Sequence, residues 1–125
     1  MNAPVIEILP EDYGIWFVDA MDHPENYEGK TVKFKARVMK PRGMGSKFFV
    51  PGRTAMTCCA DDTTFLGYVC KSAYAPKLTP GEWVEVTAKV GIEKRNEYQG
   101  EEGIVLDAEH VEQCDPLEDE MVYFN

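Results

Sequence analysis

Residues 32–39 read VKFKARVM, a stretch in which apolar side chains alternate strictly with cationic ones up to its last residue. Successive side chains of a β-strand point to opposite faces, so this pattern predicts a half-buried strand with Lys33, Lys35 and Arg37 on its outer face. Residues 84–90, VEVTAKV, alternate in the same way and predict a second strand of this kind. We therefore expect a fold built from strands that each bury one face.

Three further extended stretches and one helix complete the expected set of elements. Residues 48–59, 65–70 and 104–111 are extended stretches, of which the first is interrupted by Pro51 and Gly52, the second is short and apolar, and the third alternates at its start. A helix is predicted from four apolar residues at helical spacing, followed by a His-Pro pair that ends it: Tyr13, Trp16, Phe17 and Ala20, then His23 and Pro24.

Five strands with long second and fourth connections and a helix outside the set match the requirements of an OB-like barrel. The sequence therefore predicts a mainly β fold, an OB-like five-stranded small barrel with one N-terminal helix; a small open barrel of another topology is the alternative. We expect a single OB-like domain over residues 1–125, with a strand and a helix in 4–30, the barrel in 31–113 and an acidic C-terminal tail in 114–125. Residues 1–3 are either a native start or an expression scar.

Charge is distributed unevenly along the chain. The 125 residues include 13 basic and 22 acidic ones, and 13 − 22 gives a net charge of −9. This excess argues against nonspecific binding of the whole molecule to DNA or to anionic membranes. Eight basic residues and no acidic residue lie between Lys30 and Arg53, whereas seven acidic residues lie between Glu7 and Glu28.

Hydropathy argues against a membrane-spanning segment. No stretch contains the roughly 20 apolar residues that a transmembrane helix needs. The N-terminus also lacks the charged-then-apolar pattern of a secretory signal. We therefore expect a soluble domain.

The most unusual local feature is MTCCADD at residues 56–62, where two adjacent thiols precede two carboxylates. Cys58, Cys59 and Asp62 could hold zinc or another soft metal ion, because thiolates and nearby oxygens are suitable ligands. Neighbouring strand residues point in opposite directions, so one shared ion requires a bend, which a turn at Asp61 would supply. The alternatives are that one thiol packs in the core and that the pair forms a strained disulfide.

The other candidate ligands and catalytic groups form no recognisable set. Cys70, His110 and Cys114 contain neither a Cys-x-x-Cys motif nor a histidine pair. In an extended segment, His110 and Cys114 would lie about 13 Å apart and could not share an ion. No combination of serine, histidine and acid indicates a hydrolase triad, so enzymatic activity is the less favoured interpretation.

A second candidate site is an anion-binding or nucleic-acid-binding surface along the cationic strand. Exposed cations beside aromatic rings bind single-stranded nucleic acid on OB barrels. Alternating cations on a strand also protect a sheet edge from aggregation, which is their commoner role. The residues of this alternative are Lys33, Lys35, Arg37, Arg42, Lys47 and Phe48.

Four sequence features together resemble one family, the soluble C-terminal domain of YcgQ-like subunits of bacterial permease complexes. They are NYEGKTV at 26–32, MTCCADD at 56–62, WVEV at 83–86 and Tyr123. The resemblance implies that Cys58, Cys59 and Asp62 match the family's thiol pair and following acid. It also implies a soluble domain associated with the membrane at the bacterial cell envelope, beside a separate permease protein; without that link the domain would be cytoplasmic.

The sequence and the resemblance together predict a non-catalytic ligand-binding or interaction domain. We expect it to be accessory to a bacterial membrane permease system and to use the Cys-Cys motif for a soft metal ion. The first alternative is a single-stranded nucleic-acid-binding OB domain. The second is a thiol redox protein, which would need one exposed sulfur with a lowered pKa.

Overall fold

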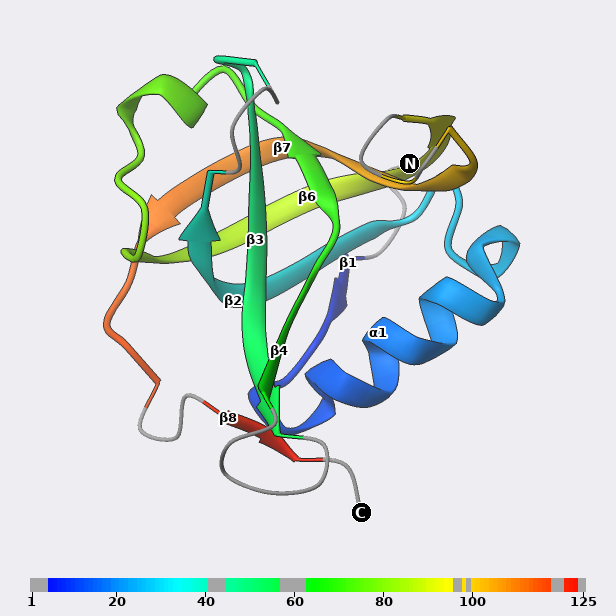
Figure 1. Ribbon diagram of the computed structural model, residues 1–125, viewed down its shortest axis with the longest axis horizontal. Coiled ribbons are helices and arrows are strands. Elements are labelled where there is room, and N and C mark those ends of the chain that lie inside the picture. Colours follow the sequence, from blue (N-terminus) through cyan, green and yellow to red (C-terminus); the bar gives the residue numbers. More distant parts are fainter. Residues whose placement is uncertain are drawn as a thin grey trace.

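A computed structural model of the protein describes residues 5–40, 45–56, 63–95, 98, 100–117 and 121–123. One α-helix, three short 3-10 helices and a set of strands make up this part of the chain (Figure 1). In chain order they are β1 (Val5–Glu7), η1 (Pro10–Asp12), α1 (Tyr13–Asp22), η2 (Pro24–Asn26), β2 (Thr31–Met39), β3 (Phe48–Met56), β4 (Thr63–Gly67), β5 (Val69–Lys71), η3 (Ala75–Lys77), β6 (Trp83–Lys94), β7 (Glu102–Gln113) and β8 (Met121–Tyr123).

The strands close into a barrel. β2 pairs with β6, β6 with β7 and β3 with β2, all antiparallel, while β7 pairs in parallel with β5, which returns antiparallel to β3. Only Tyr68 separates β4 from β5, and both pair with β3, so the two act as one interrupted strand. This closed circuit of five strands and a single α-helix confirms the predicted OB-like barrel.

The alternation seen in the sequence sets which side chains enter the barrel. On β2, Val32, Phe34, Ala36 and Val38 are buried while the residues between them face outward. β6 buries every second residue from Val84 to Val90 in the same way. Burial of apolar surface is worth about 25 cal/mol per Å². A register shifted by one residue would expose these side chains, so their burial is the main term that fixes the register.

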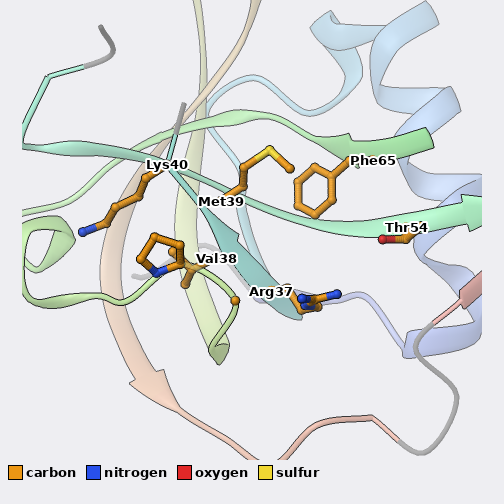
Figure 2. Close-up of a pocket in the computed structure, with 8 residues that line it drawn as sticks. Arg37, Val38, Met39, Lys40, Thr54 and Phe65 are labelled. Carbon is orange, nitrogen blue, oxygen red and sulfur yellow. The ribbon is translucent and has the colours of Figure 1, made fainter. Parts of the chain in front are cut away.

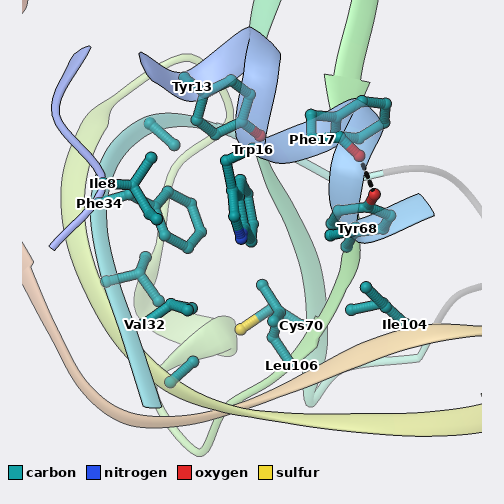
Figure 3. Packing of buried hydrophobic residues seen from close by; sticks show 14 of the residues in the cluster. Ile8, Tyr13, Trp16, Phe17, Val32, Phe34, Tyr68, Cys70, Ile104 and Leu106 are labelled. Atoms are coloured by element: carbon teal, nitrogen blue, oxygen red, sulfur yellow. Dashed lines mark hydrogen bonds between the residues drawn. The ribbon is translucent and has the colours of Figure 1, made fainter. Parts of the chain in front are cut away.

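Helix α1 closes one end of the barrel, as Figure 3 shows. Its buried face carries three aromatic rings, and the Trp16 ring centroid lies 5.3 Å from that of Phe34 on β2. Phe17 stacks on Tyr68 at 4.6 Å, and the Tyr68 hydroxyl donates a hydrogen bond of 2.5 Å to the Phe17 carbonyl. The helix is thus joined to the barrel by ring packing and by a hydrogen bond to its own backbone.

The C-terminal segment does more than form an acidic tail. β2 pairs with β3 only as far as Gly52, and β8 continues along the same edge by pairing in parallel with residues 54–56. Figure 1 shows β8 beside the end of the β3–β4 hairpin. Val122 is buried there, so burial of an apolar side chain against an otherwise unpaired edge adds a strand that was not predicted.

A buried arginine joins the two terminal segments to β3. Arg53 is 2% exposed, and its guanidinium donates hydrogen bonds to the carbonyl oxygens of Pro10 (2.6 Å) and Met121 (3.3 Å). It also lies over the Tyr13 ring, 5.7 Å from the centroid.

In the described part of the chain, no helix is long and apolar enough to cross a membrane.

Candidate ligand-binding face of the barrel

A second apolar cluster lies on the outside of the barrel. Phe48 from β3, Phe65 from β4 and Tyr98 from the β6–β7 connection are partly buried against three valines. These valines, Val50, Val69 and Val105, come from β3, β5 and β7. We call this surface of three aromatic rings and three valines the outer aromatic face.

Glycines in the strands give the rings room to lie on the backbone. A Cβ added to Gly52 would collide with the Leu66 carbonyl oxygen and lie 2.6 Å from the Phe65 ring. A Cβ on Gly103 would lie 2.5 Å from the Tyr98 ring. Glycine inside a strand commonly marks such a close approach, so these two residues shape the outer aromatic face.

Hydrogen bonding fixes the position of Tyr98. Its hydroxyl donates to the Ile104 carbonyl oxygen at 2.5 Å and accepts from the Val69 amide at 3.0 Å. The preceding turn also places the Arg95 guanidinium 4.2 Å from the Phe48 ring centroid, a cation–π contact. The β6–β7 connection is therefore held against the outer aromatic face by both polar and ring contacts.

A groove of about 580 Å³ adjoins this face beside Phe65. Figure 2 shows the Met39 side chain directed toward the Phe65 ring, with Lys40 on the side of Met39 away from that ring and Arg37 below both. Apolar walls with cations at the margin suit a ligand that combines an apolar part with negative charge. The lining residues are Arg37, Val38, Met39, Lys40, Thr54, Phe65, Pro80 and Gly81.

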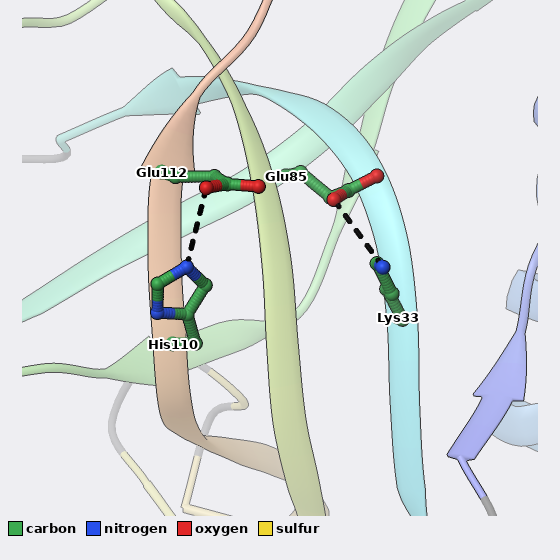
Figure 4. A network of polar contacts seen from close by, with 4 residues as sticks. All are labelled: Lys33, Glu85, His110 and Glu112. Atoms are coloured by element: carbon green, nitrogen blue, oxygen red, sulfur yellow. Dashed lines mark hydrogen bonds and ion pairs between the residues drawn. The ribbon is translucent and has the colours of Figure 1, made fainter.

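The structure divides the predicted anion-binding residues between two surfaces. Lys33 Nζ lies 3.5 Å from Glu85 Oε1 on β6 (Figure 4), and Lys35 is the register partner of the same Glu85. Arg37, two residues further along β2, lines the groove instead. Lys47 is exposed beside Phe48 of the outer aromatic face, and Arg42 lies outside the described residues.

Cys58, Cys59 and Asp62 also lie outside the described residues, so the metal site stays a prediction. On either side of them, Met56 and Thr63 are register partners across the β3–β4 ladder. The β3–β4 ladder therefore ends at the two residues that flank 57–62 in the chain. Among the described residues, no group of three His, Cys, Asp or Glu side chains is placed to hold a metal ion.

The two thiols in the described part of the chain have raised pKa values, which makes them less reactive. Burial is the largest cause for both, and it raises the pKa of the Cys70 thiol, which is fully enclosed in the core, and that of the half-buried Cys114. A raised pKa leaves less thiolate at neutral pH.

His110, another candidate ligand, is exposed on the surface of β7. Its Nε2 atom lies 3.3 Å from Glu112 Oε2 (Figure 4).

Sequence reasoning missed Phe65, Tyr98 and Arg95 as possible site residues. Phe65 lies in a stretch expected to be an apolar strand, and Arg95 and Tyr98 lie between the expected strands 84–90 and 104–111. The available signal was Gly52 and Gly67, because glycines inside two strands indicate that another group approaches the backbone closely.

The strand order and closure define a domain of the OB-like barrel class. Residues 1–124 match the model of the DUF1980 C-terminal domain, and the chain belongs to this family. This supports the resemblance at the level of the domain, while the link to a permease complex stays a prediction. No curated protein matches the sequence.

Solved structures of low sequence identity resemble the chain in fold. A chain of yeast RPA bound to ssDNA has 10% identity and a TM-score of 0.46, over 96% of this chain and 81% of that one. A chain of the S. pombe Stn1-Ten1 complex has 10% identity and a TM-score of 0.43, over 94% and 82%. Aspartyl tRNA synthetase from Entamoeba histolytica has 13% identity and a TM-score of 0.44, over 96% of this chain and 28% of that one.

Proposed function

We propose that this chain is a non-catalytic ligand-binding domain that uses the outer aromatic face and the adjoining groove. The observation that carries the proposal is a cluster of aromatic and aliphatic side chains on the outside of a barrel whose interior already holds a complete core. The three valines are buried, and the partly exposed rings of Phe48, Phe65 and Tyr98 over them, beside a groove, are typical of a binding site.

The position of the face also supports binding. OB barrels bind ligands on the surface of their second and third strands, flanked by the first and fourth connections. Here the corresponding strands are β3 and β4, with the β2–β3 and β6–β7 connections beside them. The groove adds Arg37 and Lys40, so the ligand we propose is an extended chain with apolar groups and negative charges.

A defined peptide of alternating Phe and Glu tests this proposal by fluorescence anisotropy. We expect saturable binding that weakens about tenfold in an Arg37→Gln, Lys40→Gln double variant, which corresponds to about 1.4 kcal/mol. Lys33→Gln is the matched control, since Lys33 lies beside Glu85 on another surface. Absence of binding, or an equal loss in the control, would count against the proposed face.

Single-stranded nucleic acid is the second candidate ligand, supported by the convergence of three rings with Arg95. Each base stacked on an aromatic side chain is worth about 1–3 kcal/mol. The net charge of −9 opposes this function. An oligothymidine probe at low salt would have to bind wild-type protein and lose affinity in Phe65→Leu, but not in Tyr74→Leu, whose ring is exposed elsewhere.

The soft-metal site at Cys58, Cys59 and Asp62 is a further part of the proposal. Its support is the family resemblance and the pairing of Met56 with Thr63, the two residues that flank this segment in the chain. Reduced protein should bind zinc, measured by elemental analysis, and a Cys58→Ser, Cys59→Ser variant should not. Cys114→Ser is the control thiol and should retain the metal. Zinc retained by the double variant would exclude these ligands.

We also propose that the domain is accessory to a membrane permease at the bacterial cell envelope. Membership in the DUF1980 C-terminal domain family supports this role through the resemblance described above. Co-expression with a tagged permease subunit tests it, and the expected result is co-purification of the two proteins from detergent extracts. Recovery of the chain entirely in the soluble fraction under these conditions would contradict the role.

A further inference from the structure

Helix α1 is apolar on both of its sides. Its inner side is buried in the barrel end. On its outer side, Ile15, Val18 and Met21 are 71%, 45% and 57% exposed. Three large apolar side chains exposed on the outer side of a ten-residue helix are more than single scattered residues, so this side has the character of a contact surface.

The exposed apolar side chains form one surface rather than scattered points. Residues three and seven positions apart lie on the same side of a helix, which places Ile15, Val18 and Asp22 in one row. A shallow depression of about 360 Å³ lies along this row and includes Gly14, which has no side chain to fill it. Leu9, 43% exposed, precedes the helix. We call Ile15, Val18 and Met21 with this depression the outer α1 surface.

Acidic side chains predominate in the segment that carries the outer α1 surface. The sequence contains no lysine or arginine before Lys30, whereas seven acidic residues lie between Glu7 and Glu28. Asp19 and Asp22 line the depression itself, together with His23, which lies 3.7 Å from Glu25. The surface is therefore an apolar strip with an anionic margin.

These charges select among the possible occupants. A second copy of the chain would bring two anionic margins together, and like charges placed opposite each other cost several kcal/mol. An anionic membrane would be repelled for the same reason. A protein segment with an apolar stripe flanked by lysine or arginine satisfies both the apolar strip and its margin.

We propose that the outer α1 surface binds an amphipathic helix with a basic margin from a partner protein. This surface shares no residue with the outer aromatic face or its groove. The domain therefore binds a protein partner through α1 and a ligand through the barrel strands, and one can be removed without the other.

A model peptide tests this inference without knowledge of the partner. A helix of about 18 residues, or five turns, with leucine on one side and lysine on the other, serves as the labelled probe in anisotropy titrations. We expect saturable binding, with affinity about tenfold lower in the triple variant Ile15→Ser, Val18→Ser, Met21→Ser. The same loss is expected in Glu11→Gln, Asp22→Asn, which removes one exposed acid just before the helix and one that lines the depression. All these side chains are exposed, so the variants keep the fold.

Matched controls separate this contact from general attraction to an acidic protein. Tyr74→Ser removes an exposed apolar side chain elsewhere, and Glu109→Gln, Glu112→Gln removes two charges from β7. Both should bind the peptide as wild type does, and a leucine–glutamate peptide should not bind. Equal binding by the triple variant overturns the proposal. A wild-type dimer in sedimentation that the triple variant abolishes, or binding to phosphatidylglycerol vesicles, also overturns it.

Discussion

Two glycines determine how closely groups approach the β3–β4 ladder. Gly52 and Gly67 are register partners, and a Cβ on Gly67 would lie 2.6 Å from the Val50 side chain and 2.8 Å from the Pro51 carbonyl oxygen. Because a carbonyl oxygen cannot move without disturbing the ladder, neither position accepts a side chain freely. Phe65 occupies the space that the missing Cβ of Gly52 leaves.

Gly52→Ala should therefore destabilise the protein. Collision with the Leu66 carbonyl oxygen forces a backbone shift, and such overpacking costs about 1–3 kcal/mol. Gly91→Ala is the matched control, because its Cβ would meet the Val105 carbonyl oxygen at an ordinary 3.5 Å. The free energy of unfolding from urea titrations measures both. Equal stability of the two variants would show that the ladder near Gly52 is not tightly packed.

Tyr98→Phe is expected to loosen the β6–β7 connection. The change removes the hydroxyl that accepts from the Val69 amide, and an unsatisfied amide at a partly buried site costs about 1–3 kcal/mol. Hydrogen exchange of the Val69 amide should accelerate. Tyr74→Phe, at a residue 50% exposed, should change neither stability nor exchange.

At the scale of the element, α1 acts as the closure of the barrel. Tyr13, Trp16 and Phe17 lie on its inner side. The Tyr13 hydroxyl donates a hydrogen bond of 2.9 Å to the carbonyl oxygen of Leu66 in β4. The Tyr68 hydroxyl holds the helix one turn later, by donating a hydrogen bond to the Phe17 carbonyl oxygen. The helix thus contributes to the same core as the strands.

Trp16→Ala should cost about 3–5 kcal/mol, the usual range when a large buried ring is removed from a core. The ring is 4% exposed and packs edge-on against Tyr68 at 5.7 Å. Ile15→Ala, one residue earlier and 71% exposed, is the control and should change stability by less than about 0.5 kcal/mol. Urea unfolding compares the two. A small effect of Trp16→Ala would mean that α1 is detachable from the barrel.

At the scale of the whole molecule, three tyrosines make stability depend on alkaline pH. Burial raises the pKa values of Tyr13 and Tyr68 above the ordinary range. A hydrogen bond of 2.5 Å to Asp19 is the main cause that raises the pKa of Tyr27 to about 12. All three are therefore protonated in the folded protein at pH values where unfolded tyrosine ionises.

Alkaline pH should therefore destabilise the protein. A tyrosine whose folded pKa is raised contributes stability that is fully present below its unfolded pKa of 10.0 and is lost as pH rises through the folded value. We expect urea midpoints to fall steadily from about pH 10 to about pH 12. Tyr27→Phe should reduce this fall, because that side chain no longer ionises. A pH dependence identical to wild type would show that Tyr27 does not contribute.

Local pattern was sufficient for most of the elements. Alternation in residues 32–38 and 84–90 identified β2 and β6 with their correct inner faces, and helical spacing identified α1. β8 was missed because three residues carry too little pattern, and their pairing partner on β3 is more than sixty positions away. The strand forms only where β2 has left that edge of β3 unpaired.

The sequence by itself determined the class of fold, the inner face of the alternating strands and the concentration of acids before Lys30, because these depend on neighbouring residues and on composition. Only the tertiary structure decided that Phe48, Phe65 and Tyr98 meet on one outer face while Lys33 lies apart beside Glu85. The physical reason is that a period of two specifies the side of a strand, whereas barrel closure specifies which strands become neighbours.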